Sequence, residues 1–180
     1  MNIDLETPRL ILRDFTERDA SGLLDYLSQP QPSCFASDQI HTLEEALAKI
    51  HQRQQSQDYV AVCLRDTDQL IGEIFFMREE PDTYSVGWNF NPRFQGKGYA
   101  KESTEAWINF LFEQCDARRI YAYVEDDNLA SQKLCERLGF RKEGLFLEFI
   151  SFVNHADGTP KYENTLQYAV LKKEWKLKQV

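Results

Sequence analysis

The feature that most constrains the fold of this chain is a change of hydrophobic period near residue 90. Three apolar segments that alternate like strands, residues 59–65, 70–78 and 84–90, are joined by the short polar runs DTDQ and EEPDT. Such joins are typical of hairpin turns, so the segments predict an antiparallel meander. From residue 100 the apolar side chains recur at helical spacing, and the strand-like run RIYAYV follows at 119–124. A strand, a helix and a strand in succession predict a right-handed crossover and a parallel pair of strands.

The segments on either side of this centre extend the α/β pattern. RLILRDF (9–15) alternates like a strand, and the helical runs TERDASGLLDYL and TLEEALAKI begin with capping-box spacings at Thr16 and Thr42. NLASQKLCERLGF predicts a helix that Asn128 caps and Gly139 ends. A long hairpin over residues 141–153 and 162–171 completes the pattern. With 180 residues and no repeat or linker, the chain is expected to be a single domain, 1–180.

Charge and cysteine usage exclude several classes of protein. The net charge of −8 argues against a nucleic-acid-binding protein; it suits a cationic substrate or simply solubility. The acidic start lacks the pattern of a signal peptide, and no apolar run approaches the roughly 18 residues of a membrane span. The four cysteines show no C-x-x-C pair and no histidine at metal-ligand spacing. We therefore expect reduced thiols, no metal, no membrane partner and a cytoplasmic location.

The run NPRFQGKGYA (91–100) predicts an anion-binding loop. It joins the strand that starts the parallel pair to the following helix, and ligands of open α/β sheets bind at such strand ends. Glycines at 96 and 98 let a phosphate approach the free N–H groups of the helix N-terminus, while Arg93 and Lys97 supply positive charge. The run is not a P-loop, and a dinucleotide fingerprint would need glycine where Lys101 stands. The loop is suited to a pyrophosphate, with a plain structural turn as the alternative.

Four separate stretches give the chain a family resemblance. RFQGKG fits the pattern Q/R-x-x-G-x-G/A, and the chain resembles the GNAT superfamily of acetyl-CoA-dependent N-acetyltransferases. ETPRLILRDF looks like the opening of the RimJ/RimL-like branch, and VGWNFNPRFQGKGYAKES is similar to its central strand and cofactor loop. DDNLASQKLCERLGFRKEG matches the segment N-x-x-S…LGF-x-x-EG, and LQYAVLKKEW matches the closing strand. Together the stretches cover most of the chain in the family's order.

The resemblance implies both a fold and a coenzyme site. The fold would be α/β (α+β), with a mixed, mostly antiparallel seven-stranded sheet, helices on both faces and a central parallel strand pair splayed for acetyl-CoA. Loop amides would hold the pyrophosphate of the coenzyme, and backbone donors near the end of the central strand would stabilise the oxyanion. The cofactor-binding residues carried over are Phe90, Arg93, Gln95, Gly96, Lys97, Gly98, Tyr99, Ala100 and Asn128.

The resemblance is less informative about proton transfer. Many members have a tyrosine acid where this chain has Cys135, and a glutamate base where it has Ser85. The serine of N-x-x-S, to which the acid role is assigned in the RimJ/RimL-like branch, is Ser131 here; its alternative role is packing in the first helical turn. The carboxylates left as candidate bases, or as solvated surface acids, are Glu148, Glu73 and Glu125.

The acceptor is expected to be a primary amine, either a protein N-terminal α-amine or a small molecule. A lysine amine with pKa ~10.4 is neutral in only about one molecule in 2,500 at pH 7, against roughly one in seven for an α-amine, so the α-amine needs less help from a base. Tyr84 and Trp88 are candidates to border the acceptor site, or are core residues. A non-catalytic acyl-CoA-binding protein and an aminoglycoside-type acetyltransferase stay open as alternatives. The chain is expected to be a monomer or homodimer without a nucleic-acid partner.

Overall fold

The structure of the protein is a computed structural model that describes residues 3–177. Its strands follow the order β1-β2-β3-β4-β5-β6-β8-β7, eight strands where seven were expected. The additional strand is β1 (Asp4–Glu6), which pairs antiparallel with β2 (Leu10–Arg13). Three residues, two of them acidic, carry too little alternation to be recognised from sequence, and they are ordered by pairing with β2. The chain divides into two compact units, and β4 and β5 each contribute to both.

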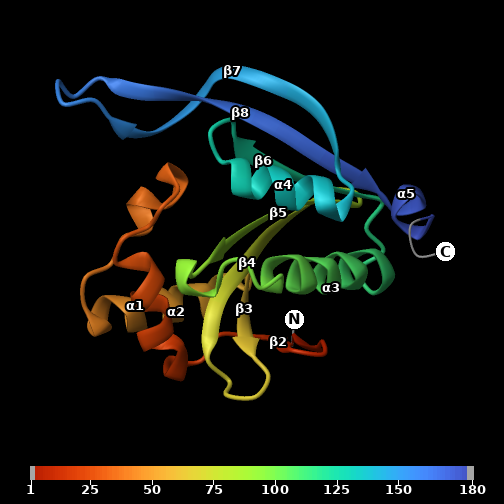
Figure 1. Cartoon of the computed structure of the whole chain (residues 1–180), viewed down its shortest axis with the longest axis horizontal. Coiled ribbons are helices and arrows are strands. Elements are labelled where there is room, and N and C mark those ends of the chain that lie inside the picture. Colours follow the sequence, from red (N-terminus) through yellow and green to blue (C-terminus); the bar gives the residue numbers. More distant parts are fainter. Residues whose placement is uncertain (1–2, 178–180) are drawn as a thin grey trace. The chain divides into compact units, whose positions relative to one another are not determined.

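The first unit comprises the chain through residue 31, residues 38–76 and residues 87–107. The strands β2, β3 (Tyr59–Leu64) and β4 (Leu70–Glu79) pair antiparallel, as the meander predicts. The helices α1 (Ala20–Leu27) and α2 (Leu43–Ser56) lie on one side of these strands, and the start of α3 (Tyr99–Glu113) lies on the other (Figure 1). Helices therefore cover both faces, as expected.

Both capping boxes form. Glu45 N–H donates to the Thr42 hydroxyl at 3.1 Å, and the Thr42 N–H donates to the Glu45 carboxylate at 3.3 Å. Thr16 N–H donates to Asp19 at 2.7 Å at the start of the short helix η1 (Glu17–Asp19) that precedes α1. These bonds satisfy N–H groups that a helix start leaves unpaired. The apolar faces of α1 and α2 then pack with Ala61 and Cys63 of β3 in one core cluster.

Two glycines on neighbouring strands accommodate phenylalanine rings in the first unit. A Cβ atom at Gly72 of β4 would collide with the ring of Phe90 and lie 2.7 Å from the Asn89 carbonyl. A Cβ atom at Gly87 of β5 (Thr83–Phe90) would collide with the ring of Phe75. Each strand therefore supplies both a glycine and a ring that occupies the space above the other strand's glycine.

An ion pair lies buried between α2 and β4. The Arg53 Nε lies 2.6 Å from Glu73 Oε2, and its Nη2 donates to Oε1 at 2.9 Å. The two side chains are 2% and 0% exposed, and the guanidinium lies 4.8 Å from the centroid of the Tyr59 ring. The interpretation of Glu73 as a surface acid is therefore wrong. The strand sequence does not distinguish a buried acid from a solvated one, and the cation that makes burial of Glu73 tolerable comes from α2.

The second unit comprises residues 32–37, residues 77–86 and the chain from residue 108. Here β5 pairs in parallel with β6 (Arg119–Glu125) from Thr83↔Arg119 to Ser85↔Tyr121, which confirms the predicted parallel pair. Next to β6 lies β8 (Pro160–Leu171), followed by β7 (Arg141–Asn154). The helix α4 (Leu129–Leu138) ends at Gly139, in the left-handed conformation expected of a helix C-cap. The short helix α5 (Lys172–Lys176) follows β8.

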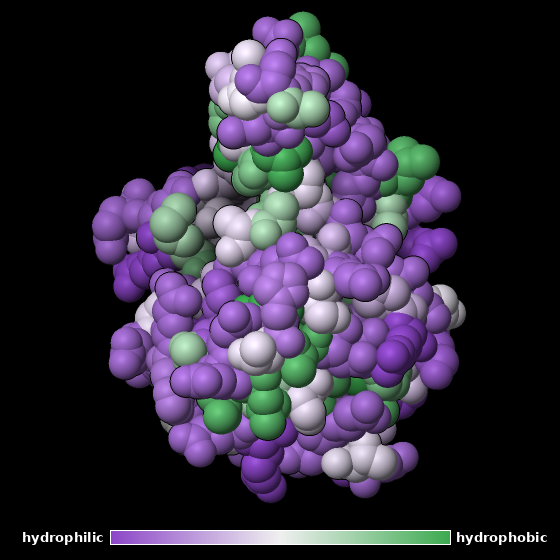
Figure 2. Space-filling model, turned by 90° about the vertical axis from the view of Figure 1, so that its left-hand side faces the viewer, coloured by the Kyte–Doolittle hydropathy of each residue, from purple (hydrophilic) through white to green (hydrophobic). Residues whose placement is uncertain are grey.

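The hairpin of β7 and β8 extends beyond β6, the strand that pairs with it. β8 pairs with β6 only from Thr165 to Leu171, so the hairpin continues beyond β6 (Figure 1). Figure 2 looks onto the end of this hairpin, at the top of the view, where apolar groups (green) lie among hydrophilic ones (purple). Several large apolar side chains of β7 are exposed, Leu147 by 72%. Among the described residues, no helix is long and apolar enough to cross a membrane.

The buried ion pair generates a stability prediction. Glu73→Leu leaves the Arg53 charge buried without its partner, and we expect it to lower the free energy of unfolding by about 3–5 kcal/mol. Arg53→Met should cost a similar amount, whereas the double variant should recover most of the loss because no buried charge remains. Urea unfolding of the four proteins measures the cycle. Additive losses in the double variant would show that the pair is not coupled.

Candidate functional site

The run from Asn91 to Ala100 connects β5 to α3 within the first unit and begins with a buried asparagine. Asn91 is 2% exposed, and its N–H donates to the Ile71 carbonyl at 2.9 Å. Its side-chain oxygen accepts from the Arg93 N–H at 3.0 Å, and its Nδ2 donates to Asp25 of α1 at 2.7 Å. Asn91 therefore fixes the start of the loop to a strand through its backbone and to a helix through its side chain. The short helix η3 (Pro92–Phe94) follows it.

The two loop glycines have left-handed backbones. Gly96 has φ of 77° and Gly98 has φ of 81°, a region that other residues enter at a cost. A Cβ atom at Gly96 would meet nothing within 4 Å, so space is open above this backbone. The first described α3 hydrogen bond runs from Glu102 N–H to the Gly98 carbonyl at 3.1 Å. The preceding N–H groups of the helix start have no intrahelical acceptor, which is the arrangement that binds anions.

Two cationic side chains lie on this loop. The Arg93 side chain is 75% exposed, and its Nη1 lies 2.9 Å from Asp25. Lys97 is exposed, with its ammonium 5.6 Å from the centroid of the Phe94 ring. Exposed cations beside a helix N-terminus add long-range attraction for a phosphate. The two glycines and the two cations are thus arranged in a way that fits an anion, while the binding roles of the predicted loop residues stay predictions. Phe90 packs its ring over Gly72 just before the loop begins.

The sequence analysis did not single out Arg9, which binds both the loop and the first turn of α3. Arg9 Nη1 donates to the Lys97 carbonyl at 2.9 Å, and Nη2 lies 2.6 Å from Glu102 Oε2. Its guanidinium also lies 4.7 Å from the centroid of the Tyr99 ring. Burial raises the pKa of Glu102, but hydrogen bonds from Thr7 and Arg9 outweigh it and the net shift is downward. No spacing signal connects Arg9 to residues about ninety positions later, although both stretches were recognised as family motifs.

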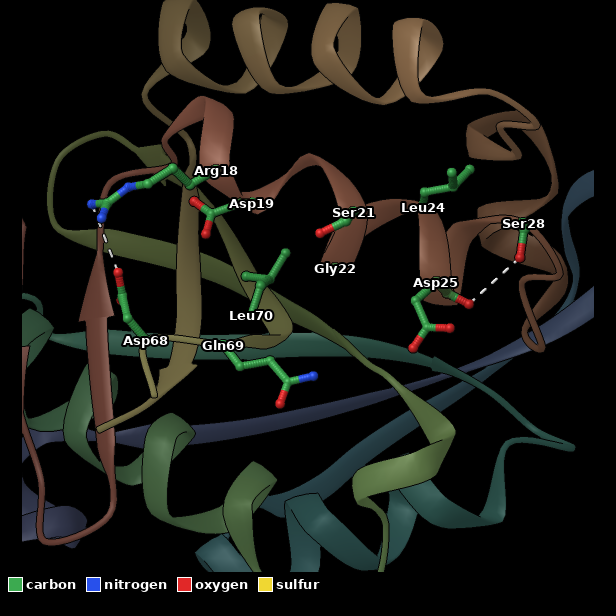
Figure 3. Close-up of a pocket in the computed structure, with 10 residues that line it drawn as sticks. All are labelled: Arg18, Asp19, Ser21, Gly22, Leu24, Asp25, Ser28, Asp68, Gln69 and Leu70. Carbon is green, nitrogen blue, oxygen red and sulfur yellow. Dashed lines mark hydrogen bonds and ion pairs between the residues drawn. The ribbon is translucent and has the colours of Figure 1, made fainter. Parts of the chain in front are cut away.

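A hollow of about 440 Å³ opens beside α1 in the same unit (Figure 3). Three aspartates line it, and each has an arginine partner. Arg13 lies 2.8 Å from Asp19 and 2.9 Å from Asp68, and Asp25 binds Arg93 as described above. Figure 3 also shows the Arg18 side chain reaching Asp68. The carboxylates of the hollow are therefore already paired with arginines.

The predicted acid and its helix lie in the second unit. Asn128 caps α4, since its side-chain oxygen accepts from the Ser131 N–H at 3.1 Å. Ser131 is half-buried in the first turn, whereas Cys135, one turn later, is fully buried. Burial raises the pKa of the Cys135 thiol to about 12, so the thiol stays protonated at neutral pH. Of the two side chains, only that of Ser131 is partly accessible.

The remaining candidates lie on the strands β5, β6 and β7. Glu148 is exposed on β7, with φ of 47°, and its N–H donates to Asn164. Glu125, expected as a possible surface acid, is instead 8% exposed at the end of β6, so that interpretation is wrong. Tyr84 of the second unit is 4% exposed, and burial raises the pKa of its hydroxyl. Trp88, in the first unit, is half-buried. These positions leave the acceptor roles of Tyr84 and Trp88 as predictions.

Comparison with known proteins identifies the chain. Residues 9–141 match the family model of the acetyltransferase (GNAT) domain. The uncharacterized N-acetyltransferase YnaD of Bacillus subtilis is 31% identical over 173 residues, 95% of this chain and 98% of the relative. The [ribosomal protein uS5]-alanine N-acetyltransferase of Escherichia coli is 27% identical, covering 82% of this chain and 83% of the relative.

A solved structure confirms the fold. The crystal structure of a GNAT-family acetyltransferase from Bacillus anthracis aligns with a TM-score of 0.82 and 27% identity, covering 97% of this chain and 100% of the other. The eight strands and flanking helices described above are thus a GNAT fold. The chain belongs to the GNAT family of acetyltransferases.

Proposed function

We propose that this acetyltransferase moves the acetyl group of acetyl-CoA to a primary amine, either a protein N-terminal α-amine or a small-molecule amine. The observation that carries the proposal is the loop before α3, where two left-handed glycines lie beside a helix N-terminus and two exposed cations. Acetyl-CoA-dependent amine acetylation is the general reaction of the family.

Different residues of the loop contribute hydrogen-bond donors and positive charge for the coenzyme pyrophosphate. The N–H groups from Gly96 to Ala100 are the hydrogen-bond donors, because the two glycines in this run have no Cβ atoms that would keep a phosphate away. Arg93 and Lys97 add charge, while Gln95 and Tyr99 flank the turn. The open space above Gly96 supports this assignment, since a bulky anion needs room next to the backbone. Arg9 and Asn91 keep the loop in this conformation through the bonds described above.

The chemistry requires a neutral amine and a tolerable leaving group. The amine nitrogen forms a bond to the thioester carbonyl carbon, the C–S bond then breaks, and the proton lost by nitrogen balances the thiolate that leaves. A thiol pKa near ~8.5 makes this departure possible with modest help. At pH 7 a larger fraction of α-amines than of lysine amines is neutral. This supports an acceptor that is a protein N-terminus or a small amine of low pKa. The ribosomal-protein specificity named for the Escherichia coli relative is one member of that class.

The alternatives make different predictions. An aminoglycoside-type enzyme would acetylate a polycationic sugar and leave peptide N-termini unchanged. A panel of peptide, aliphatic and aminoglycoside amines, followed by release of free thiol from acetyl-CoA, distinguishes these acceptors. Absence of turnover with every class, together with intact coenzyme A binding, would favour the non-catalytic alternative over the proposal.

The loop assignment predicts the effect of Gly98→Asp. Because it places a negative charge and a strained backbone at the pyrophosphate, we expect coenzyme A affinity to fall by more than about tenfold in calorimetry. Gly158→Asp is the matched control: Gly158 also has a positive φ, 85°, and an added Cβ atom there would meet nothing within 4 Å. Both variants add the same charge and the same kind of strain. Equal affinity in the two variants would exclude the loop as the pyrophosphate site.

The acid assignment predicts a separate effect in α4. Ser131→Ala should lower kcat by more than about tenfold with little change in the KM for acetyl-CoA, because a general acid acts on the leaving group rather than on binding. Cys135→Ala should lower the melting temperature, since the thiol is fully buried, and should change kcat little. Steady-state kinetics from pH 6 to 9 measure both. Full kcat in Ser131→Ala across this range would leave the serine with a structural role alone.

A further inference from the structure

The β7–β8 hairpin carries a concentration of exposed apolar side chains. Among the described residues, ten large apolar residues are exposed, and five of them belong to this hairpin, so the exposure is concentrated rather than scattered. We call these five residues the hairpin patch: Leu145, Phe146, Leu147, Phe149 and Tyr162. Figure 2 looks onto the end of the hairpin, where green groups lie among purple ones.

The sequence of β7 is that of a strand covered on both faces. From Gly144 to Val153 its only charged residue is Glu148, and a nearly continuous apolar run is typical of strands buried on both sides. In the strand register Leu145 pairs with Leu166, and Phe146 pairs with Thr165. Successive residues point to opposite faces, and both Leu145 and Phe146 are exposed. Both faces of the hairpin are therefore open at a point where the sequence is apolar.

A bulge in β7 gives the patch a defined shape. Three residues of β7, Leu147 to Phe149, lie opposite the single residue Asn164 of β8. Glu148 has φ of 47°, and its N–H donates to the Asn164 side chain at 2.9 Å, which holds the bulge in place. Leu147 is thereby 72% exposed, and the Phe149 ring lies 5.1 Å from the Phe146 ring between centroids. The apolar groups are thus arranged before any partner arrives.

The patch lies on an edge of the sheet. The strand order ends with β7, which pairs with β8 on one side and is 14 residues long. Edge strands present unpaired N–H and C=O groups, and proteins usually protect them with charged residues, with proline or by keeping them short. The apolar part of β7 is neither short nor rich in charge. A long apolar edge of this kind requires a cover, because otherwise it promotes aggregation.

The exposed area is of the size that a protein–protein interface needs. A large apolar side chain has on the order of 150–250 Å² of surface, so five such residues exposed by 38% to 72% present roughly 500 Å². A standard interface buries about 800 Å² on each partner. The patch supplies the apolar centre of such an interface, and the backbone edge and polar residues around it can supply the rest.

The charge of the chain favours a second copy over a lipid surface. With a net charge of −8, the protein is repelled by anionic membranes. A two-fold interface brings the same patch of both copies together, so it must be complementary to itself. Apolar side chains meet this condition, since like apolar groups attract in water whereas like charges repel. A closed pair also covers the edge of β7 once and leaves no further edge for growth.

We propose that two copies of this chain form a two-fold dimer through the hairpin patch. In this dimer the five apolar side chains of each copy are buried against those of the other, and the edges of the two β7 strands are covered. This assembly does not depend on the identity of the acetyl acceptor.

Sedimentation equilibrium between 1 and 100 µM tests the dimer. We expect the wild-type protein to have about twice the monomer mass of 21.1 kDa at 100 µM. Leu147→Glu should weaken the dimer by more than about a hundredfold, because the charge is introduced twice, once in each copy, and is removed from water. Tyr162→Glu, on the other strand of the hairpin, should have the same effect. Both positions are exposed, so the monomers should fold, which circular dichroism checks.

The matched control is Leu43→Glu, the same change at an exposed leucine of α2 in the first unit. It should leave the dimer intact. Hydrogen exchange at 5 and 200 µM locates the contact independently: amides of residues 144–153 should be better protected at the higher concentration. The proposal is overturned by a monomeric wild type at 100 µM, by dimers that persist in both Leu147→Glu and Tyr162→Glu, or by equal dissociation of Leu43→Glu. Exchange in residues 144–153 that does not depend on concentration would overturn it as well.

Discussion

The candidate site depends on one salt-bridged arginine close to the start of the chain. Arg9 joins the Lys97 carbonyl, the Glu102 carboxylate and the Tyr99 ring, and so determines how the glycine loop meets the first turn of α3. Glycine backbones at positive φ are easily rearranged, and without external contacts the loop would lose the orientation of its N–H groups. Asn91 supplies the matching restraint at the other end by bonding to Asp25. A flexible sequence is thereby held in one conformation before any ligand arrives, which lowers the entropic cost of binding.

Much of the fold followed from local sequence patterns. The meander, the crossover, the two capping boxes and the Gly139 helix end were all predicted, because each depends on residues only a few positions apart. The strand β1 was missed since its three residues are ordered by their partner rather than by their own pattern. The candidate site shows the same dependence on distance along the chain. The glycines and cations of the loop were found within one run of ten residues, whereas Arg9 and Asp25 act on it from distant parts of the chain.

The burial of two acidic side chains is the clearest example of what the sequence did not predict. Glu73 and Glu125 both stand in alternating strands, and nothing in their neighbourhood distinguishes a buried acid from a solvated one. Tertiary structure gives them different environments: Glu73 is paired with Arg53, whereas Glu125 lies beside a thiol and a hydroxyl with one oxygen unsatisfied. Neither strand shows this difference in its own sequence, because Arg53 and Cys34 come from other parts of the chain.

The paired glycines and phenylalanines of β4 and β5 restrict how this chain can diverge. Gly72 makes room for Phe90, and Gly87 makes room for Phe75, so each glycine is fixed by a ring on the other strand. A larger residue at either glycine would be tolerated only with a smaller one at its partner, so the four positions should change in pairs when relatives are aligned. If one strand slipped by one residue, each ring would collide with a Cβ atom on the other strand. The two contacts therefore also specify the register of the two strands.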